Sequence, residues 1–212
     1  MNRSNLLWTW LGALGMSALL FSCALTSKGE AMSPRYFSPE PVSEAKSPRA
    51  ARPFEMRLGQ VSSASHLDER IAYRIGGSEM GFYDERRWTE IPEAYLRRAL
   101  ERELFEQRGL SRLVTGFGPT LDVELTAFEE LRSKPLKARV TLAFSLRDER
   151  HSLIERTLDV EQPVAERAGS DAAQRLAETM TAALDDAVRQ LGSEVVLALS
   201  TAQAKPTEND PH

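Results

Sequence analysis

Hydrophobic and polar residues alternate along five segments of this chain, with the two-residue period of a β-strand. The alternation covers residues 54–61, 71–75, 121–127, 140–147 and 154–160. Leu113-Val114 is a candidate for a further, short strand. The turns that join the last three segments are short and polar, so we expect these strands to be antiparallel neighbours with one solvated face.

Two other segments carry apolar residues at helical spacing. The first runs from about Thr89 to Arg108, with Thr89 as a candidate N-cap, Pro92 at the start and Gly109 at the C′ position. The second runs from Ser170, also a candidate N-cap, to about Leu199, and Gly192 is a candidate kink or end.

The resulting order is β-β-α-β-β-β-β-α. It predicts an α+β fold in which two α-helices pack on one face of an antiparallel β-sheet, a meander. The second helix has two interpretations. It lies across the sheet, or its far end protrudes and pairs with another subunit, which leaves a homo-oligomer open.

The N-terminus has the pattern of a signal peptide rather than of a folded domain. Arg3 precedes sixteen uncharged residues, from Leu6 to Phe21. A transmembrane helix needs about 20 apolar residues, so this shorter stretch is typical of a signal-peptide core. We therefore predict that residues 1–22 are a lipoprotein signal peptide.

Cys23 is the single cysteine of the chain, and it follows Leu20-Phe21-Ser22 at the end of that apolar stretch. This arrangement resembles a bacterial lipobox, in which the cysteine sulfur takes a diacylglycerol and the freed amine a further acyl chain, commonly palmitate. Two or three acyl chains hold a protein on a membrane stably. We therefore predict Cys23 as the lipidation site. Residue 24 is Ala rather than Asp, which by the enterobacterial sorting habit favours the outer membrane over the inner one.

Proline and polar residues mark the segments on either side of the predicted domain. Residues 23–53 hold five of the eleven prolines and are rich in Ser, Ala and Glu, so we interpret them as a tether that follows the lipidated cysteine. The aromatic pair Tyr36-Phe37 within them is either a random inclusion or a short first strand docked on the domain. Residues 201–212 are predicted to be a disordered tail. The folded domain is then residues 54–200.

The composition excludes several classes of protein. A formal charge of −4 disfavours a nucleic-acid binder, and one cysteine with three histidines excludes a disulfide scaffold and a thiolate-rich zinc site. No hydrolase, metalloprotease or nucleotide-binding motif is present in the sequence. Both glycine-rich stretches, 76–81 and 116–118, are interpreted as turns. We expect no enzyme activity, no cofactor and no metal.

Residues 76–88 are predicted to form a loop that is unusually rich in aromatic residues and arginine, which are enriched in binding hot spots. Two interpretations are open: Tyr83 and Trp88 pin the loop to the first helix, or the loop is a surface for a partner. In the second case the candidate contact residues are Tyr73, Phe82, Tyr83, Arg87 and Trp88.

The sequence from Leu58 to Leu104 resembles the ABC-type transport auxiliary lipoprotein family, in particular its PqiC-like group. Cys23 and the pair Tyr36-Phe37 match the N-terminal pattern of that family. The remaining matching residues, in order, are Leu67, Ile71, Tyr73, Arg74, Tyr83, Trp88, Pro92, Leu96, Leu100 and Leu104.

The resemblance implies a non-enzymatic component of a system for intermembrane lipid transport. Such a system combines an ATPase, a permease and a substrate-binding protein with a mammalian-cell-entry (MCE) domain. The lipoprotein would be anchored to a membrane of the Gram-negative envelope, face the periplasm and dock onto the MCE protein. The nucleotide site belongs to the ATPase subunit.

Two alternatives remain beside this hypothesis. The chain is another kind of envelope lipoprotein, such as an outer-membrane assembly chaperone or an activator of cell-wall synthesis, because a fold does not determine a function. In the other alternative, the domain itself carries lipid, which requires a deep apolar cavity.

Overall fold

A computed structural model of the chain describes residues 33–39, 54–149, 151–166 and 171–204. Apart from Ser33, these residues belong to one unit that begins at Pro34. Its strands are β1 (Arg35–Phe37), β2 (Glu55–Ser63), β3 (Arg70–Ile75), β4 (Glu79–Trp88), β5 (Ser111–Arg112), β6 (Thr120–Leu131), β7 (Lys137–Arg147) and β8 (Ser152–Pro163). Its helices are α1 (Pro92–Glu101), the π-helix η1 (Arg102–Gln107) that continues α1, and α2 (Ala172–Ala204).

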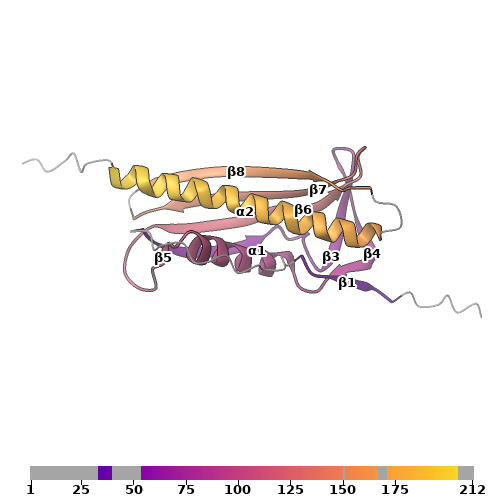
Figure 1. Ribbon diagram of the computed structural model, residues 1–212, viewed down its shortest axis with the longest axis horizontal. Coiled ribbons are helices and arrows are strands. Elements are labelled where there is room, and N and C mark those ends of the chain that lie inside the picture. Colours follow the sequence, from indigo (N-terminus) through magenta and orange to yellow (C-terminus); the bar gives the residue numbers. More distant parts are fainter. Residues whose placement is uncertain (1–32, 40–53, 150, 167–170, 205–212) are drawn as a thin grey trace, which may run out of the picture. The chain divides into compact units, whose positions relative to one another are not determined.

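The sheet is organised around β6, which pairs on both edges. β7 runs antiparallel to β6 along its whole length, and β8 runs antiparallel to β7. On the other edge of β6, β2 lies parallel to the first half and β3 lies parallel to the last three residues. β4 and then β1 extend the sheet beyond β3, while β5 lies beside β2 (Figure 1).

Alternate side chains make one face of β6 and β7 hydrophobic. Leu121 and Leu125 of β6, like Leu142 and Leu146 of β7, have no exposed surface. The residues between them point to the opposite face, because successive side chains of a strand alternate. The alternation predicted for the last three strands, and their antiparallel order, are confirmed.

α1 buries one apolar stripe on this face, formed by Tyr95, Leu96, Ala99 and Leu100. Pro92 opens the helix as predicted, but the predicted N-cap Thr89 is wrong: the N-cap residue is Ile91, which makes no side-chain cap. The Thr89 hydroxyl instead lies 2.7 Å from the hydroxyl of Tyr95. Thr89 thus contacts a side chain of the helix rather than capping a backbone N–H of its first turn.

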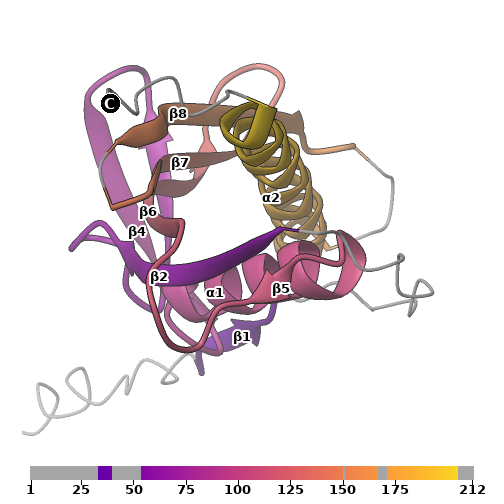
Figure 2. The ribbon, with the colours of Figure 1, turned by 90° about the vertical axis from the view of Figure 1, so that its left-hand side faces the viewer.

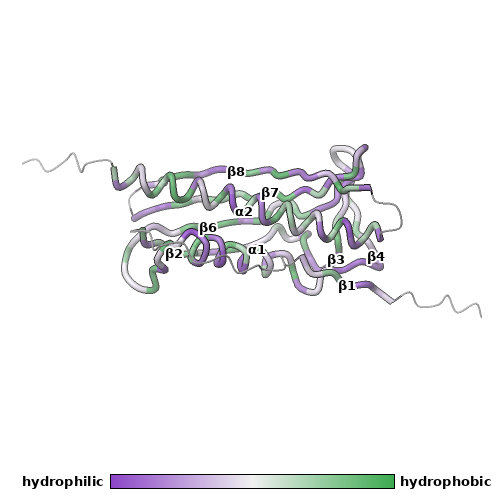
Figure 3. The backbone as a smooth tube through the Cα atoms, viewed as in Figure 1, coloured by the Kyte–Doolittle hydropathy of each residue, from purple (hydrophilic) through white to green (hydrophobic). Residues whose placement is uncertain are grey.

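Both helices contribute to the same hydrophobic core as the inner face of the sheet. Figure 1 shows both helices in front of the strands, and Figure 2 shows α2 beside β7 and β8 with α1 next to β2. Hydrophobic residues (green) and hydrophilic residues (purple) follow one another along the whole of α2 (Figure 3). In the described ranges, no helix combines the length and the apolar character needed to cross a membrane.

Gly192 does not end α2, which continues to Ala204, beyond the predicted end near Leu199. It lies where η1 approaches α2: a Cβ at this position would be 2.6 Å from the Arg108 Nε. Glycine therefore permits a close helix contact here. Ser170, the predicted N-cap, and residues 205–212 of the predicted tail lie outside the described residues.

The predicted sheet was wrong in two respects. It is mixed rather than a purely antiparallel meander, because β2 and β3 run parallel to β6. It also has β4, which the predicted order lacked, and the strand expected at Leu113-Val114 is Ser111–Arg112 instead. β1 agrees with the alternative that Tyr36-Phe37 belongs to a short first strand. Alternation reveals which side chains are buried but carries no information on the direction of the neighbouring strand.

Residues 76–88, which were predicted to be a loop, instead form the turn and the second strand of a β-hairpin with β3. Gly76, with a φ of 60°, and Gly77 form its turn, and the residues from Glu79 onward pair antiparallel with β3. Periodicity missed β4 because most of its residues are intermediate in exposure on both faces, so neither face reads as apolar.

Candidate functional site

Cys23, the predicted lipidation site, lies outside the described residues. The five predicted contact residues are placed on β3 and β4, and the structure does not bring them into one patch. Tyr73 and Tyr83 lie together on one face of the β3–β4 hairpin, whereas Phe82, the neighbour of Tyr83, points to the other face.

Trp88 is a core residue. Its side chain is 1% exposed and packs against Phe128 of β6, with ring centroids 5.1 Å apart. Of the two interpretations of this residue, such deep burial favours the structural one. That interpretation had Tyr83 and Trp88 pin the segment to the first helix, whereas the ring that Trp88 packs against belongs to β6.

Arg87 and Phe82 are partly buried and engage other residues of the same unit. The guanidinium of Arg70 lies 4.4 Å from the centre of the Phe82 ring, and Arg70 is itself held by Asp68 at 2.8 Å. Burial alone would raise the pKa of Asp68. Hydrogen bonds and charge from Arg70, together with the charge of Arg87, outweigh that effect and lower the pKa.

Tyr73, Tyr83, Arg86, Glu130 and Arg132 form a group that we call the tyrosine–arginine cluster. The two tyrosine rings meet edge to face, with centroids 5.1 Å apart. The Arg132 guanidinium lies 3.3 Å from the centre of the Tyr73 ring, and that of Arg86 lies 4.2 Å from Tyr83. Stacked guanidinium groups of this kind are attracted by the negative face of the ring.

The polar groups of the tyrosine–arginine cluster satisfy one another. The Tyr83 hydroxyl donates a hydrogen bond to the carboxylate of Glu130, and Arg132 lies 3.7 Å from that carboxylate. Burial, followed by the hydrogen bond to Glu130, raises the pKa of Tyr83, so the hydroxyl stays protonated and remains a donor. Sequence reasoning missed Glu130 and Arg132, which lie about fifty residues away along the chain.

A second ion pair network lies on the opposite face of β6. Glu129 has no exposed surface, and its carboxylate accepts hydrogen bonds from Arg74 of β3 at 2.8 Å and from Arg139 of β7. Burial alone would raise the pKa of Glu129, but the two guanidinium groups outweigh it and lower the pKa. Three strands are thus linked through one carboxylate.

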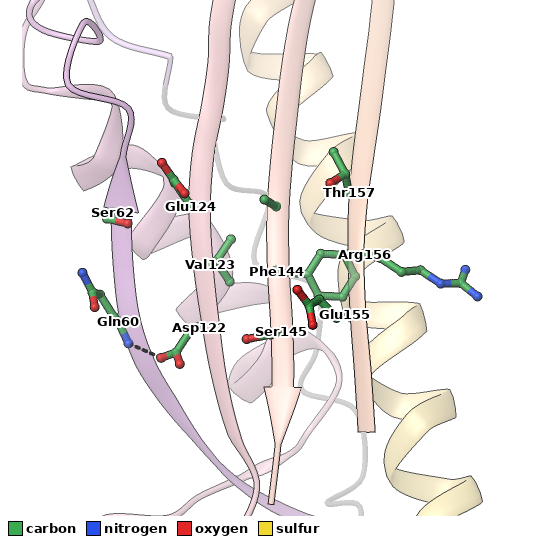
Figure 4. Close-up of a pocket in the computed structure, with 11 residues that line it drawn as sticks. Gln60, Ser62, Asp122, Val123, Glu124, Phe144, Ser145, Glu155, Arg156 and Thr157 are labelled. Carbon is green, nitrogen blue, oxygen red and sulfur yellow. Dashed lines mark hydrogen bonds between the residues drawn. The ribbon is translucent and has the colours of Figure 1, made fainter. Parts of the chain in front are cut away.

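The polar face of the sheet is hollowed between β2, β6, β7 and β8, with a volume of about 600 Å³ (Figure 4). Polar side chains dominate its lining, among them Gln60, Asp122, Ser145 and Thr157. The backbone N–H of Gln60 donates to the Asp122 carboxylate at 2.8 Å. Among the residues that the structure describes, no group of three or more His, Cys, Asp or Glu is placed to hold a metal ion.

A different kind of surface lies at the end of α2 that contains Leu197. Two adjoining hollows of about 450 and 760 Å³ lie between the loop of residues 113–119, the start of β8 and the last turns of α2. Two large apolar side chains of their lining are exposed, Phe117 at 87% and Leu197 at 63%, and Val114 of the same loop is 77% exposed. The stretch 116–118 is a turn as predicted, but Phe117 was not identified as a candidate contact residue. Its position between two glycines in a turn could have indicated that the side chain is exposed.

None of the three hollows is lined by apolar side chains alone. The apolar side chains of the inner strands and both helices instead pack into one contiguous core. These hollows therefore do not provide the deep apolar cavity that direct lipid carriage would require.

Comparison with known proteins gives one family and several similar folds. The family model described as "ABC-type transport auxiliary lipoprotein component" matches residues 37–196, from β1 to the second half of α2. The solved structure of protein XCC0632 from Xanthomonas campestris is similar with a TM-score of 0.65 and 18% identity, covering 81% of this chain and 99% of that one. A second solved structure, described as an uncharacterized protein, has a TM-score of 0.57 at 13% identity, covering 77% and 99%. No curated protein matches the chain.

Proposed function

This chain belongs to the ABC-type transport auxiliary lipoprotein family, and we propose from this premise that it serves an MCE-type lipid transporter in the Gram-negative envelope. In this proposal it is a non-enzymatic adaptor that faces the periplasm and docks onto the MCE protein. The ATPase and permease of the same system supply the nucleotide chemistry and the membrane passage. The observation that carries the proposal is the family match, which spans every element from β2 to β8 and most of α2.

We propose that Cys23 anchors the chain through its acyl groups, with the outer membrane favoured by Ala24. The position of this cysteine directly after the apolar stretch of residues 6–21 supports lipidation. Two or three acyl chains would give lasting attachment, since each buried CH₂ contributes about 0.8 kcal/mol.

The internal pairing of the charged clusters supports an adaptor rather than a catalyst. Glu129 is held by Arg74 of β3, and Glu130 is held by the Tyr83 hydroxyl of β4 and by Arg132, which follows β6. A catalytic acid or base needs a free face toward a substrate, and these two carboxylates are used in joining strands.

Affinity capture from envelope extracts tests the proposed function. A correctly lipidated, full-length chain with a C-terminal affinity tag is expected to recover an MCE-domain protein or its permease. Recovery of outer-membrane assembly factors or cell-wall synthases in their place would support the alternative class of envelope lipoprotein. Capture of none of these by an anchored bait would contradict the proposal.

A further inference from the structure

The two adjoining hollows at the Leu197 end of α2 form a surface that we call the end groove. Its apolar lining comes from three separate elements: Leu113 and Phe117 in the loop before β6, Leu153 and Ile154 at the start of β8, and Leu197 and Leu199 on α2. The ion pair of Arg156 with Glu194, 3.1 Å apart, lies within the same lining. A groove with apolar side chains and a few polar groups is the usual form of a binding site.

The loop that presents Phe117 is held in place by hydrogen bonds. The Arg57 side chain donates to the Gly116 carbonyl oxygen at 2.8 Å, and the backbone N–H of Leu113 donates to the Met56 carbonyl oxygen at 2.9 Å. Gly116 has a φ of 83°, and a Cβ on Gly118 would lie 2.6 Å from the Leu113 side chain. These contacts keep Phe117 outside the core, where it forgoes about 1.5–3 kcal/mol of burial. A side chain held in this way is ready for a partner at a low cost in conformational entropy.

The membrane tether reaches the domain at the other end of α2. Arg35 of β1 pairs with Asp171 at 2.5 Å, directly before the first turn of the helix. Leu197 is 26 residues beyond Asp171, which corresponds to roughly 39 Å of α-helix at 1.5 Å per residue. Figure 1 likewise shows β1 and the end of α2 on opposite sides of the unit. The groove is therefore remote from the point where the anchored segment enters.

The segments of the chain next to the groove are chemically unsuited to fill it. Residues 205–212 follow α2 directly and contain no large apolar residue. Residues 40–53 precede Phe54, which lines the groove, and have a single large aliphatic residue, Val42. The occupant must supply apolar side chains from another molecule.

We propose that the end groove is the docking site for an apolar segment of the transporter's MCE protein. This inference rests on the proposed function and adds the surface that carries it. A concave groove accepts the side chains of a peptide segment, whereas a bilayer presents a broad and nearly planar surface. The position of the groove directs the docked partner away from the anchoring end of the domain.

The test compares capture by the lipidated full-length chain with capture by the double variant Phe117→Asp, Leu197→Asp. Two buried carboxylates in the interface should reduce recovery of the MCE protein about tenfold or more. The control is Ile75→Asp, which changes another exposed aliphatic side chain at the tip of the β3–β4 hairpin and should leave recovery unchanged. Because Phe117 is 87% exposed, Phe117→Ala keeps the fold and should also reduce recovery, which guards against misfolding of the double variant.

Three outcomes would overturn the assignment. If the wild type captures the MCE protein and the double variant captures it equally well, the groove is not the docking site although the proposed function stands. If the wild type captures no transporter subunit, the proposed function itself fails, and this inference with it. If a photocrosslinker at position 117 reacts in cells with phospholipid or with a second copy of this chain, the occupant is a membrane or a dimer rather than the MCE protein.

Discussion

Gly81 shows how one missing side chain shapes the tyrosine–arginine cluster. The ring of Tyr73 lies across Gly81, so a Cβ at that position would be 2.5 Å from the Tyr73 Cζ. The same ring lies under the Arg132 guanidinium. The ring is therefore confined between the backbone of β4 and Arg132, and Gly81 is required for that packing.

Gly81→Ala is expected to destabilise the domain by about 1–3 kcal/mol, because the added methyl group displaces the Tyr73 ring from Arg132. Urea unfolding of the purified chain measures the loss. The matched control is Gly77→Ala in the same hairpin, where a Cβ would meet nothing within 4 Å. Gly77→Ala should be neutral or slightly stabilising, and an equal effect of both substitutions would contradict this account.

The predicted contact residues illustrate why composition does not distinguish a core from an interface. Tryptophan and tyrosine are common in both, so the sequence alone does not tell whether Trp88 belongs to a core or to an interface. The exposed fraction of the side chain decides it: Trp88 is 1% exposed, whereas Phe117 is 87% exposed. That difference arises from contacts between segments far apart in the chain.

At the scale of the elements, Glu129 connects three strands. It belongs to β6, and its partners Arg74 and Arg139 belong to the strands on either side, β3 and β7. The parallel pairing of β3 with β6 puts Arg74 within reach of this carboxylate. The network therefore stabilises the mixed part of the sheet that alternation did not predict.

Glu129→Gln is expected to cost about 2–4 kcal/mol at neutral pH, because it leaves two largely buried guanidinium groups without a counter-charge. The free energy of unfolding in urea measures this loss. The control is Glu161→Gln, which removes the half-exposed partner of Lys137 on the same face and should change stability by less than about 1 kcal/mol. Equal losses in the two variants would contradict the special role of Glu129.

The same carboxylate should also give the domain a measurable pH dependence. The pKa of Glu129 in the fold lies below its ordinary value of 4.5, so the ion pairs contribute fully above that pH. Their contribution is lost as the pH falls through the lowered pKa. As the pH falls below about 4.5 and through the lowered pKa, the unfolding free energy of Glu129→Gln should fall less steeply than that of the wild type, and parallel curves in this acid range would contradict the prediction.

At the scale of the whole molecule, the signal-peptide pattern ends directly before Cys23, and the folded unit begins a short distance later, at Pro34. Pro34 is the eleventh residue after Cys23, and a chain of eleven residues can span at most about 36–40 Å when fully extended. An anchored chain would therefore hold β1 close to its membrane. We expect anchorage and folding to be separable properties.

Cys23→Ser should release the chain from the membrane without altering the unfolding transition of the domain, because the substitution removes the only thiol that could carry acyl groups. Fractionation of cells into soluble and membrane material measures the release, and thermal unfolding checks the fold. Ser22→Ala, which keeps a small residue before the cysteine, is the control and should remain membrane-bound. Retention of Cys23→Ser on the membrane would show that another feature anchors the chain.

The sequence by itself determined the local properties of this protein. The alternation of Leu121, Val123 and Leu125 specified which face of β6 is buried, and the stripe from Tyr95 to Leu100 specified the inner side of α1. Such patterns are readable because the side-chain period of a strand or helix is imposed by its own backbone. The order of the matching residues also sufficed to identify the family.

Only the tertiary structure decided how these elements meet. The parallel pairing of β2 and β3 along one edge of β6, the burial of Trp88 and the exposure of Phe117 all depend on contacts between distant segments. The free energy of such contacts comes from shape and surface shared by two elements, and neither element carries that information alone. For the same reason, the end groove became recognisable only when β8, α2 and the loop before β6 were seen side by side.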